Sequence, residues 1–303
     1  MSKVLVTGGA GWLGRSVVAG LAAAGHEVVS VDMISLPGMA AEQRIVDLTD
    51  AGNAYEIIAR QRPEAIVHLA AIAIPFSAPE HRILARNTAL AFNVMQAAVD
   101  LQVPKIITAS SPTIIGYGAP GGWIPERFPL DEEIQPRPWN AYALSKHIAE
   151  QIAGMFAAKA PNGARFAAFR PCYVTAPEEW IGGPTQQGHT VRERLDDPAL
   201  SAPALFNYLD ARDAADFVLA LLAGMDSIPN AQTFFVGAAD ALARQPLAEL
   251  IPLFYPGTEH AAASLTGTSP AFSIAKAERL LGWTPRRSWR TELAEAAVSL
   301  ETA

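Results

Sequence analysis

The chain has 303 residues, of which 50% are hydrophobic and 17% are charged, with a formal net charge of -7 and a pI near 5.4. This composition is typical of a packed globular protein of one large or two modest domains, and it excludes extended disorder. The acidic balance argues against a nucleic-acid partner, because phosphate binding requires a basic face.

The cysteine count and the apolar runs limit the class of protein further. A single cysteine, Cys172, excludes an internal disulfide and a cysteine-built zinc site. The N-terminus passes from MSK into VLVTGGAG without the apolar segment of a signal peptide. His26, His68 and glycines interrupt the longest apolar runs well short of a membrane span. We therefore expect a soluble, cytoplasmic protein with neither a membrane partner nor a bound metal.

Short apolar runs alternate with helical patterns over the first part of the chain. Strands are predicted at residues 3–8, 26–32, 44–47, 64–70, 104–110 and 164–170. Their hydrophobicity is continuous rather than alternating, as expected for strands that are buried on both faces of a parallel sheet. Helical patterns fill the intervals, notably 80–102 and 140–158. This order predicts an α/β fold, a Rossmann-type doubly wound parallel sheet.

The sequence changes character after Arg170. Residues 177–203 are rich in Pro, Gly and Gln, and the later segments are shorter and less regular. We expect a nucleotide-binding domain over residues 1–170 and a smaller α/β substrate lobe over 171–303, interleaved with the first. Within that lobe, Ser273 as N-cap and Gly282 as the stop predict a short helix.

A glycine-rich turn follows the first predicted strand, in the phrase VTGGAGWLGR. A strand leads into it and a helix leads out, which is the context of a dinucleotide-binding turn. Its glycines let the backbone approach a pyrophosphate, whose charge then lies at the helix N-terminus. The cofactor-binding residues predicted in this turn are Gly8, Gly11, Trp12, Leu13 and Gly14.

Asp32, at the end of the second predicted strand, extends this pattern. Its carboxylate would accept both adenosine ribose hydroxyls and repel a 2′-phosphate, so NAD is favoured over NADP. The alternative is that the glycines only make a tight turn and that Asp32 caps a loop. Further contacts are predicted at the ends of the third and fourth strands, where His68 is interpreted as a core histidine. These contacts are Asp47 and Leu48 at the adenine edge, and Leu69, Ala70 and Ala71 beside the dinucleotide backbone.

The phrase WNAYALSKHIAE places Tyr142 and Lys146 four residues apart, on one face of a helix. The fifth strand ends at Ser110 and Ser111, on the sheet edge where ligands bind. A tyrosine pKa near 10 is too high for a base at neutral pH, but a lysine cation and a positive nicotinamide ring would lower it. Tyr142 could then take the proton of a substrate alcohol while Ser111 holds the same oxygen and Lys146 binds the ribose.

The motifs TGGAGWLG, VHLAA, SS…IGYG, YALSK and LLGWTP together resemble the extended short-chain dehydrogenase/reductases, also called NAD-dependent epimerase/dehydratases. The resemblance covers essentially the whole chain. It implies bound NAD, a C-terminal substrate lobe and Ser111, Tyr142 and Lys146 as the catalytic triad. It also implies that Asn87 orders the cofactor region, that Pro171 contacts the cofactor and that the chain forms a homodimer.

Three departures from the family pattern bear on the substrate. Tyr173 stands where members that bind nucleotide sugars commonly have asparagine, and Pro112 and Thr113 replace the acidic residues of sugar 4,6-dehydratases. The phrase SSPTIIGY, with Ile115, is similar to uronate dehydrogenases, which oxidise a free sugar acid. Thr113 and Tyr173 are therefore predicted substrate contacts. Arg192 lies in a polar run that could fold over the substrate or be a plain surface loop, and in the first case it is the predicted partner for a carboxylate or phosphate.

Together, these motifs predict an NAD-dependent dehydrogenase or epimerase that acts by hydride transfer at a secondary alcohol of a sugar-like small molecule. Two other readings stay open. One is a nucleotide-sugar (UDP-sugar) 4-epimerase, and the other is a non-catalytic protein that senses the redox state of NAD. No residue decides between dehydrogenase and epimerase.

Overall fold

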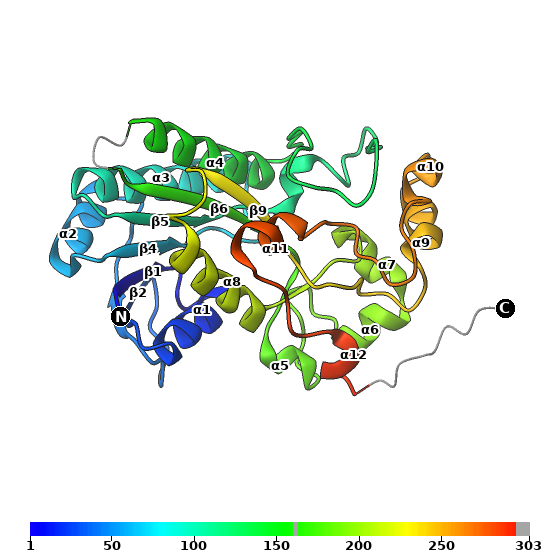
Figure 1. Cartoon of the computed structure of the whole chain (residues 1–303), viewed down its shortest axis with the longest axis horizontal. Helices are drawn as coiled ribbons and strands as arrows, with labels where there is room; N and C mark the ends of the chain where they lie inside the picture. The colour runs from blue at the N-terminus through cyan, green and yellow to red at the C-terminus, as the bar shows by residue number, and fades with distance from the viewer. Residues whose placement is uncertain (160–162, 295–303) are drawn as a thin grey trace.

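The structure is a computed structural model that describes residues 1–159 and 163–294 (Figure 1). Its centre is a sheet of seven parallel strands in the order β3-β2-β1-β4-β5-β6-β9. The strands are β1 Lys3–Thr7, β2 Glu27–Asp32, β3 Glu42–Ile45, β4 Ala65–His68, β5 Lys105–Ala109, β6 Arg165–Pro171 and β9 Gln232–Val236. The predicted doubly wound fold is confirmed, and the chain reverses its direction across the sheet between β1 and β4.

Helices cover both faces of this sheet (Figure 1). On one face lie α2 Ala51–Gln61, α3 Glu80–Asp100 and α4 Ala141–Lys159, and on the other lie α1 Trp12–Ala23 and α8 Ala211–Gly224. Strand β1 shows why its sequence is apolar throughout. Leu5 packs into the core under α2, α3 and α4, whereas Val4 and Val6 pack into the core under α1 and α8. Both faces are therefore buried, as the continuous hydrophobicity predicted.

The chain beyond β6 builds a second group of elements and also returns to the sheet. Helix α8 packs on α1, and β9 pairs with β6 as the edge strand. Residues beyond 171 therefore contribute a strand and a helix to the central layers, and the division into two interleaved lobes at residue 171 stays a prediction. The remaining elements are short: η1 Pro112–Ile115, β7 Val174–Thr175, α5 Pro177–Trp180, α6 Val191–Asp196, α7 Pro198–Ser201, η2 Ala202–Ala204, β8 Leu209–Asp210, α9 Leu247–Phe254, α10 Glu259–Ala262, α11 Ala275–Leu281 and α12 Trp289–Glu292.

Helix α11 shows the local prediction to be correct at one end only. Gly282 ends it in the left-handed conformation with φ 64°, as expected. The N-cap residue, however, is Ile274 rather than Ser273, although the Ser273 hydroxyl still accepts a hydrogen bond from the Ala275 amide at 3.3 Å.

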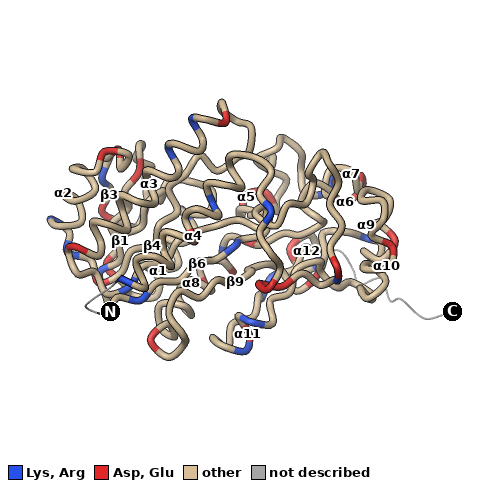
Figure 2. The backbone as a smooth tube through the Cα atoms, turned by 90° about the horizontal axis from the view of Figure 1, so that it is seen from above, with Lys and Arg blue, Asp and Glu red and all other residues tan. Residues whose placement is uncertain are grey.

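Acidic and basic residues are interspersed along the chain (Figure 2). Among the residues described, no helix is both long enough and apolar enough to cross a membrane. The same part of the chain contains no group of three or more His, Cys, Asp and Glu side chains placed to hold a metal ion.

Candidate active site

A cavity of about 630 Å³ lies at the carboxyl ends of the central strands. Nearly all the predicted site residues line it, and only Asn87 and Arg192 do not. The predicted residues that line it are Gly8, Gly11, Trp12, Leu13, Gly14, Asp32, Asp47, Leu48, Leu69, Ala70, Ala71, Ser111, Thr113, Tyr142, Lys146, Pro171 and Tyr173. This edge of the sheet includes the reversal between β1 and β4, where ligands bind in open α/β sheets.

The glycine-rich turn is packed too tightly for side chains at two positions. Gly8 has φ 73°, and a Cβ added there would lie 2.7 Å from the Ala70 amide nitrogen. A Cβ on Gly14 would lie 2.1 Å from the Gly8 carbonyl oxygen. Helix α1 begins after Gly11, with no side-chain cap on its first amides. The turn thus brings bare backbone and a helix N-terminus to the cavity, and this cradle fits a pyrophosphate.

Asp32 is held in place at the end of β2. Its carboxylate accepts hydrogen bonds from the Ala10 amide at 3.0 Å and from the Met33 amide at 2.7 Å. Asp47 is fixed by Thr49, whose amide and hydroxyl donate to it, and by Arg86 at 3.3 Å. These hydrogen bonds, those of Thr49 foremost, hold the pKa of Asp47 below its usual value. Because Asp32 ends β2 and Asp47 follows β3, both acids lie at the end of the cavity nearest the β2–β3 edge of the sheet.

Two buried side chains support the loop after β4. The Thr7 hydroxyl lies 2.8 Å from His68 Nδ1 and accepts from the amides of Leu69 and Ala70. Burial lowers the pKa of His68 to about 3, so the ring is neutral, as expected for a core histidine. The Asn87 side chain accepts a hydrogen bond from the Ile72 amide and donates one to the Ile72 carbonyl oxygen. It also donates to the Ser145 hydroxyl. Asn87 lies outside the cavity lining and fixes this loop against α4.

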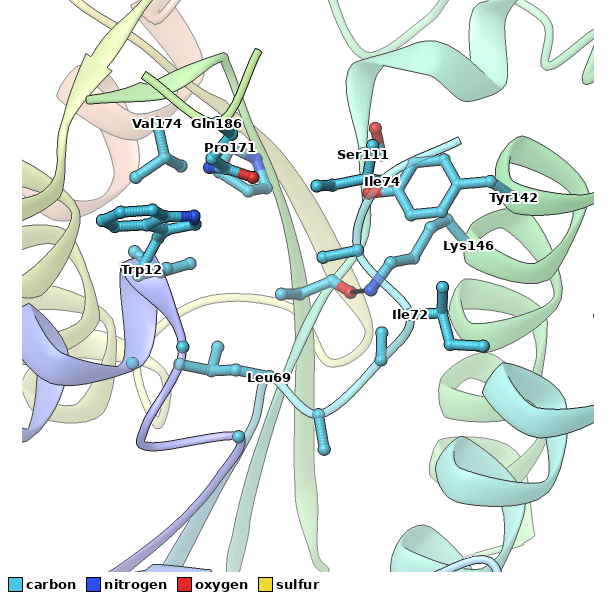
Figure 3. A pocket seen from close by; sticks show the side chains of 18 of the residues that line it. Trp12, Leu69, Ile72, Ile74, Ser111, Tyr142, Lys146, Pro171, Val174 and Gln186 are labelled. Atoms are coloured by element: carbon cyan, nitrogen blue, oxygen red, sulfur yellow. Dashed lines mark hydrogen bonds between the residues drawn. The ribbon is translucent and has the colours of Figure 1, made fainter. Parts of the chain in front are cut away.

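The three predicted catalytic side chains meet in this cavity (Figure 3). Ser111 follows β5 and caps η1, while Tyr142 and Lys146 come from the first turns of α4. The Lys146 ammonium donates to the Ala109 carbonyl oxygen at 3.0 Å and lies 5.9 Å from the centre of the Tyr142 ring. Figure 3 shows Tyr142 and Lys146 on one side of the cavity and Trp12 on the other.

The protonation states differ from the sequence-based expectation. Burial raises the pKa of Tyr142 to about 12, although a hydrogen bond with Ser111 acts in the lowering direction. Burial also lowers the pKa of Lys146 to about 8. The expected lowering of the tyrosine pKa by the lysine is therefore wrong for the chain alone. Desolvation is the larger effect, and Lys146 is turned toward a backbone carbonyl.

The predicted anion partner, Arg192, does not reach the cavity. It is exposed, and it donates to the Leu293 carbonyl oxygen at 3.1 Å. The arginine beside the cavity wall is Arg194, which is 1% exposed and stacks 3.9 Å over the ring of Tyr173. The sequence contains a signal that Arg194 rather than Arg192 faces inward, because the Thr190–Glu193 capping box starts helix α6 at Val191. Helical spacing then turns Val191, Arg194 and Leu195 inward and Arg192 outward.

Other residues of the lining had no local sequence signal. Arg86 comes from α3, and Asn207 and Phe272 come from segments far apart in the chain. The lining residues not named as site residues from the sequence include Met33, Ile34, Arg86, Tyr117, Pro203, Ala204, Asn207 and Phe272.

The family model described as NAD dependent epimerase/dehydratase family matches residues 4–237. The chain belongs to this family. Among curated proteins, the chain is similar to GDP-6-deoxy-D-talose 4-dehydrogenase from Aggregatibacter actinomycetemcomitans, with 31% identity over 155 residues. UDP-glucose 4-epimerase from Azospirillum brasilense is 32% identical over 157 residues. These matches cover 51% and 50% of this chain, and 48% and 43% of the two relatives. The chain thus matches less than half the length of each.

Several solved structures share the fold over nearly the whole chain. A UDP-glucose 4-epimerase from Thermotoga maritima aligns with a TM-score of 0.71 at 21% identity, covering 96% of this chain and 95% of that one. WbmG from Bordetella bronchiseptica, solved in complex with NAD, aligns with a TM-score of 0.68 at 20% identity, covering 97% and 92%. A mutated uronate dehydrogenase aligns with a TM-score of 0.66 at 21% identity, covering 99% and 89%.

Proposed function

We propose that this chain binds NAD and catalyses hydride transfer at a secondary alcohol of a sugar-like small molecule. One observation carries the proposal: Ser111, Tyr142 and Lys146 line the same cavity as the glycine cradle and Asp32. The family to which the chain belongs is NAD dependent, and the cradle fits a dinucleotide. A hydroxyl, a phenol and an ammonium beside such a site form the donor and acceptor set that alcohol oxidation requires.

Each side chain has a distinct role in this proposal. The amides at the start of α1 bind the pyrophosphate, and the fixed carboxylate of Asp32 accepts the ribose hydroxyls. The Lys146 ammonium, which donates a hydrogen bond to the Ala109 carbonyl oxygen, would also donate to the hydroxyls of the nicotinamide ribose or would donate to them instead. Ser111 orients the alcohol oxygen of the substrate, and Tyr142, in its phenolate form, takes the proton of that alcohol. Bound NAD supplies the positive ring that accepts the hydride.

The outcome after this step separates a dehydrogenase from an epimerase. A dehydrogenase releases NADH, whereas an epimerase returns the hydride to the opposite face of the same carbon. The names of the curated relatives include both classes. Absorbance at 340 nm, followed together with chromatography of the substrate, distinguishes the two. NADH accumulation indicates a dehydrogenase, and a changed configuration with a flat trace indicates an epimerase.

Tyr142→Phe tests the proposal directly. We expect a loss of turnover of about a hundredfold to ten-thousandfold, since the phenol proton carrier is gone, with NAD affinity retained. Tyr55→Phe, on α2 and outside the cavity lining, is the matched control and should keep full turnover. Full turnover in Tyr142→Phe, or NAD binding without turnover of any sugar in the native chain, would contradict catalysis at this site. The latter result would favour an NAD sensor.

We also infer that the chain forms a homodimer through α3 and α4. The two helices pack side by side, and their outer surface exposes Phe92 at 41% and Leu144 at 37%. Apolar side chains on two adjacent helices suit a helix-to-helix contact with a second copy. A cytoplasmic location stays a prediction.

A further inference from the structure

Charged side chains are few in the cavity lining, and all of them except Lys146 lie toward the β2–β3 edge. Only four of the lining residues are ionisable as Asp, Glu, Lys, Arg or His: Asp32, Asp47, Arg86 and Lys146. Asp32 ends β2, Asp47 follows β3, and Arg86 is paired with Asp47 at 3.3 Å. Strands β1 and β4 lie between β2 and β5, so about 14 Å separates these residues from the strand that leads to Ser111. They cannot neutralise a charge on the reacting molecule.

Lys146 is the remaining cation of the lining. It is 7% exposed, donates to the Ala109 carbonyl and lies beneath the ring of Tyr142. In the proposed function this ammonium serves the nicotinamide ribose. Apart from Lys146, no lining residue that follows Ser111 in the chain is an Asp, Glu, Lys, Arg or His. These residues form the uncharged wall, and the ones that bear on the substrate are Thr113, Tyr173, Pro203, Ala204, Asn207 and Phe272.

Two arginines contact residues of the lining from outside the cavity, since Arg15 stacks on Trp12 and Arg194 on Tyr173. Arg194 lies behind the ring of Tyr173, which separates it from the cavity, and its Nη1 donates to Gln187 Oε1 at 3.4 Å, while its Nε is buried without a hydrogen-bond partner. Arg15 on α1 pairs with Glu178 on α5 at 2.6 Å. Neither arginine lines the cavity.

The polar atoms of the wall suit hydroxyl groups. Asn207 donates its amide hydrogens to the carbonyls of Ala204 and Leu205, at 3.0 and 2.7 Å, which fixes the amide orientation. Its Oδ1 is buried without a hydrogen-bond partner, and so is the Tyr173 hydroxyl. A group that meets the Asn207 oxygen has to donate a proton. A sugar hydroxyl can do so, whereas a carboxylate or phosphate oxygen cannot.

From this distribution we propose that the reacting molecule is uncharged, a neutral sugar or polyol rather than a sugar acid, a sugar phosphate or a nucleotide diphosphate sugar. The inference rests on the proposed function and names its substrate class. Burying a carboxylate or diphosphate against this wall would leave the anion without a counter-charge in the lining, since the ring of Tyr173 lies between the cavity and Arg194, and such burial is strongly unfavourable. A neutral polyol needs only hydrogen bonds, which the serine, threonine, glutamine and asparagine side chains of the lining can supply.

Calorimetry with the NAD-loaded chain tests this proposal, with UDP and galacturonate as probes. We expect each to bind more weakly than about 5 mM, a free energy of only about -3 kcal/mol. Tighter binding of either anion would overturn the proposal. UDP would then indicate a nucleotide-sugar enzyme, and galacturonate would indicate a uronate enzyme.

A variant that adds a positive charge to the wall tests whether the lack of a cation there is the reason that anions bind weakly. Ala204→Arg places a guanidinium on the uncharged wall and should bind UDP at least about tenfold more tightly than the native chain. Ala199→Arg adds the same charge at an exposed position outside the lining and should not. If Ala204→Arg does not fold, Pro203→Arg carries the charge from an exposed lining position. A folded variant with no gain would contradict the proposal.

The failure of the proposed function would look different. Loss of NAD binding, or turnover that does not depend on Tyr142, would remove the hydride-transfer proposal and leave the measured anion affinities unchanged.

Discussion

Burial sets the chemistry of Tyr142 at the scale of the single residue. With a pKa raised to about 12, the phenol holds its proton at neutral pH, and the hydrogen bond with Ser111 favours the phenolate. Below its pKa, the phenolate fraction of a tyrosine rises tenfold for each pH unit. Alcohol oxidation should therefore speed up as the pH rises. A plot of the oxidation rate against pH should therefore have an ascending limb, and the positive nicotinamide ring would shift that limb to lower pH.

Ser111→Ala should move that limb to higher pH, in addition to lowering the rate. Removing the hydrogen bond takes away a stabilisation of the phenolate, so the tyrosine pKa rises and a higher pH is needed for the same fraction of base. The measurement is log kcat/KM for oxidation from about pH 6 to about pH 10. A Ser111→Ala limb at the native position would show that Ser111 only orients the substrate.

At the scale of the element, the strand–turn–helix unit at residues 3–23 depends on a glycine with no room for a side chain. Gly14→Ala would place a methyl group 2.1 Å from the Gly8 carbonyl oxygen, so the turn and α1 must separate. We expect a loss of about 3 kcal/mol in the free energy of unfolding, together with weaker NAD binding.

Gly154→Ala in α4 is the control, since a Cβ there meets nothing within 4 Å. Helix propensity should leave it unchanged or about 1 kcal/mol more stable. Urea unfolding of both variants checks this, and equal stabilities would contradict the packing argument.

The same elements show how far the sequence can be interpreted. The strands through β6, the turn and the Tyr142–Lys146 helix were predictable because each has a local pattern of hydrophobicity, glycine or spacing. Strand β9 was missed because QTFFV lies in an irregular region, and its role depends on pairing with β6. Asn207 and Phe272 reach the cavity only through tertiary packing. Arg192 and Arg194 differ by two positions, which is enough to exchange the outer and inner faces of a helix.

The exposed apolar surface of α3 and α4 is a property of the whole molecule. Phe92→Asp should shift the chain from dimer to monomer, because it places a charge in the proposed contact between copies. Light scattering after size exclusion measures the mass. Leu253→Asp, on α9 and 73% exposed, is a control that should leave the mass unchanged. A native chain that elutes as a monomer would contradict the dimer.

The position of β9 in the chain has a consequence for how the protein is made. Six strands of the sheet lie within the first 171 residues, but their last neighbour arrives only after residues 172–231. At cellular rates of synthesis this delay is on the order of several seconds. During that time β6, with Phe166 and Phe169, has an unpaired edge open to other chains. A ribosome stalled before residue 236 would therefore carry an aggregation-prone nascent chain, and a fragment ending at residue 170 is unsuited to expression as a separate domain.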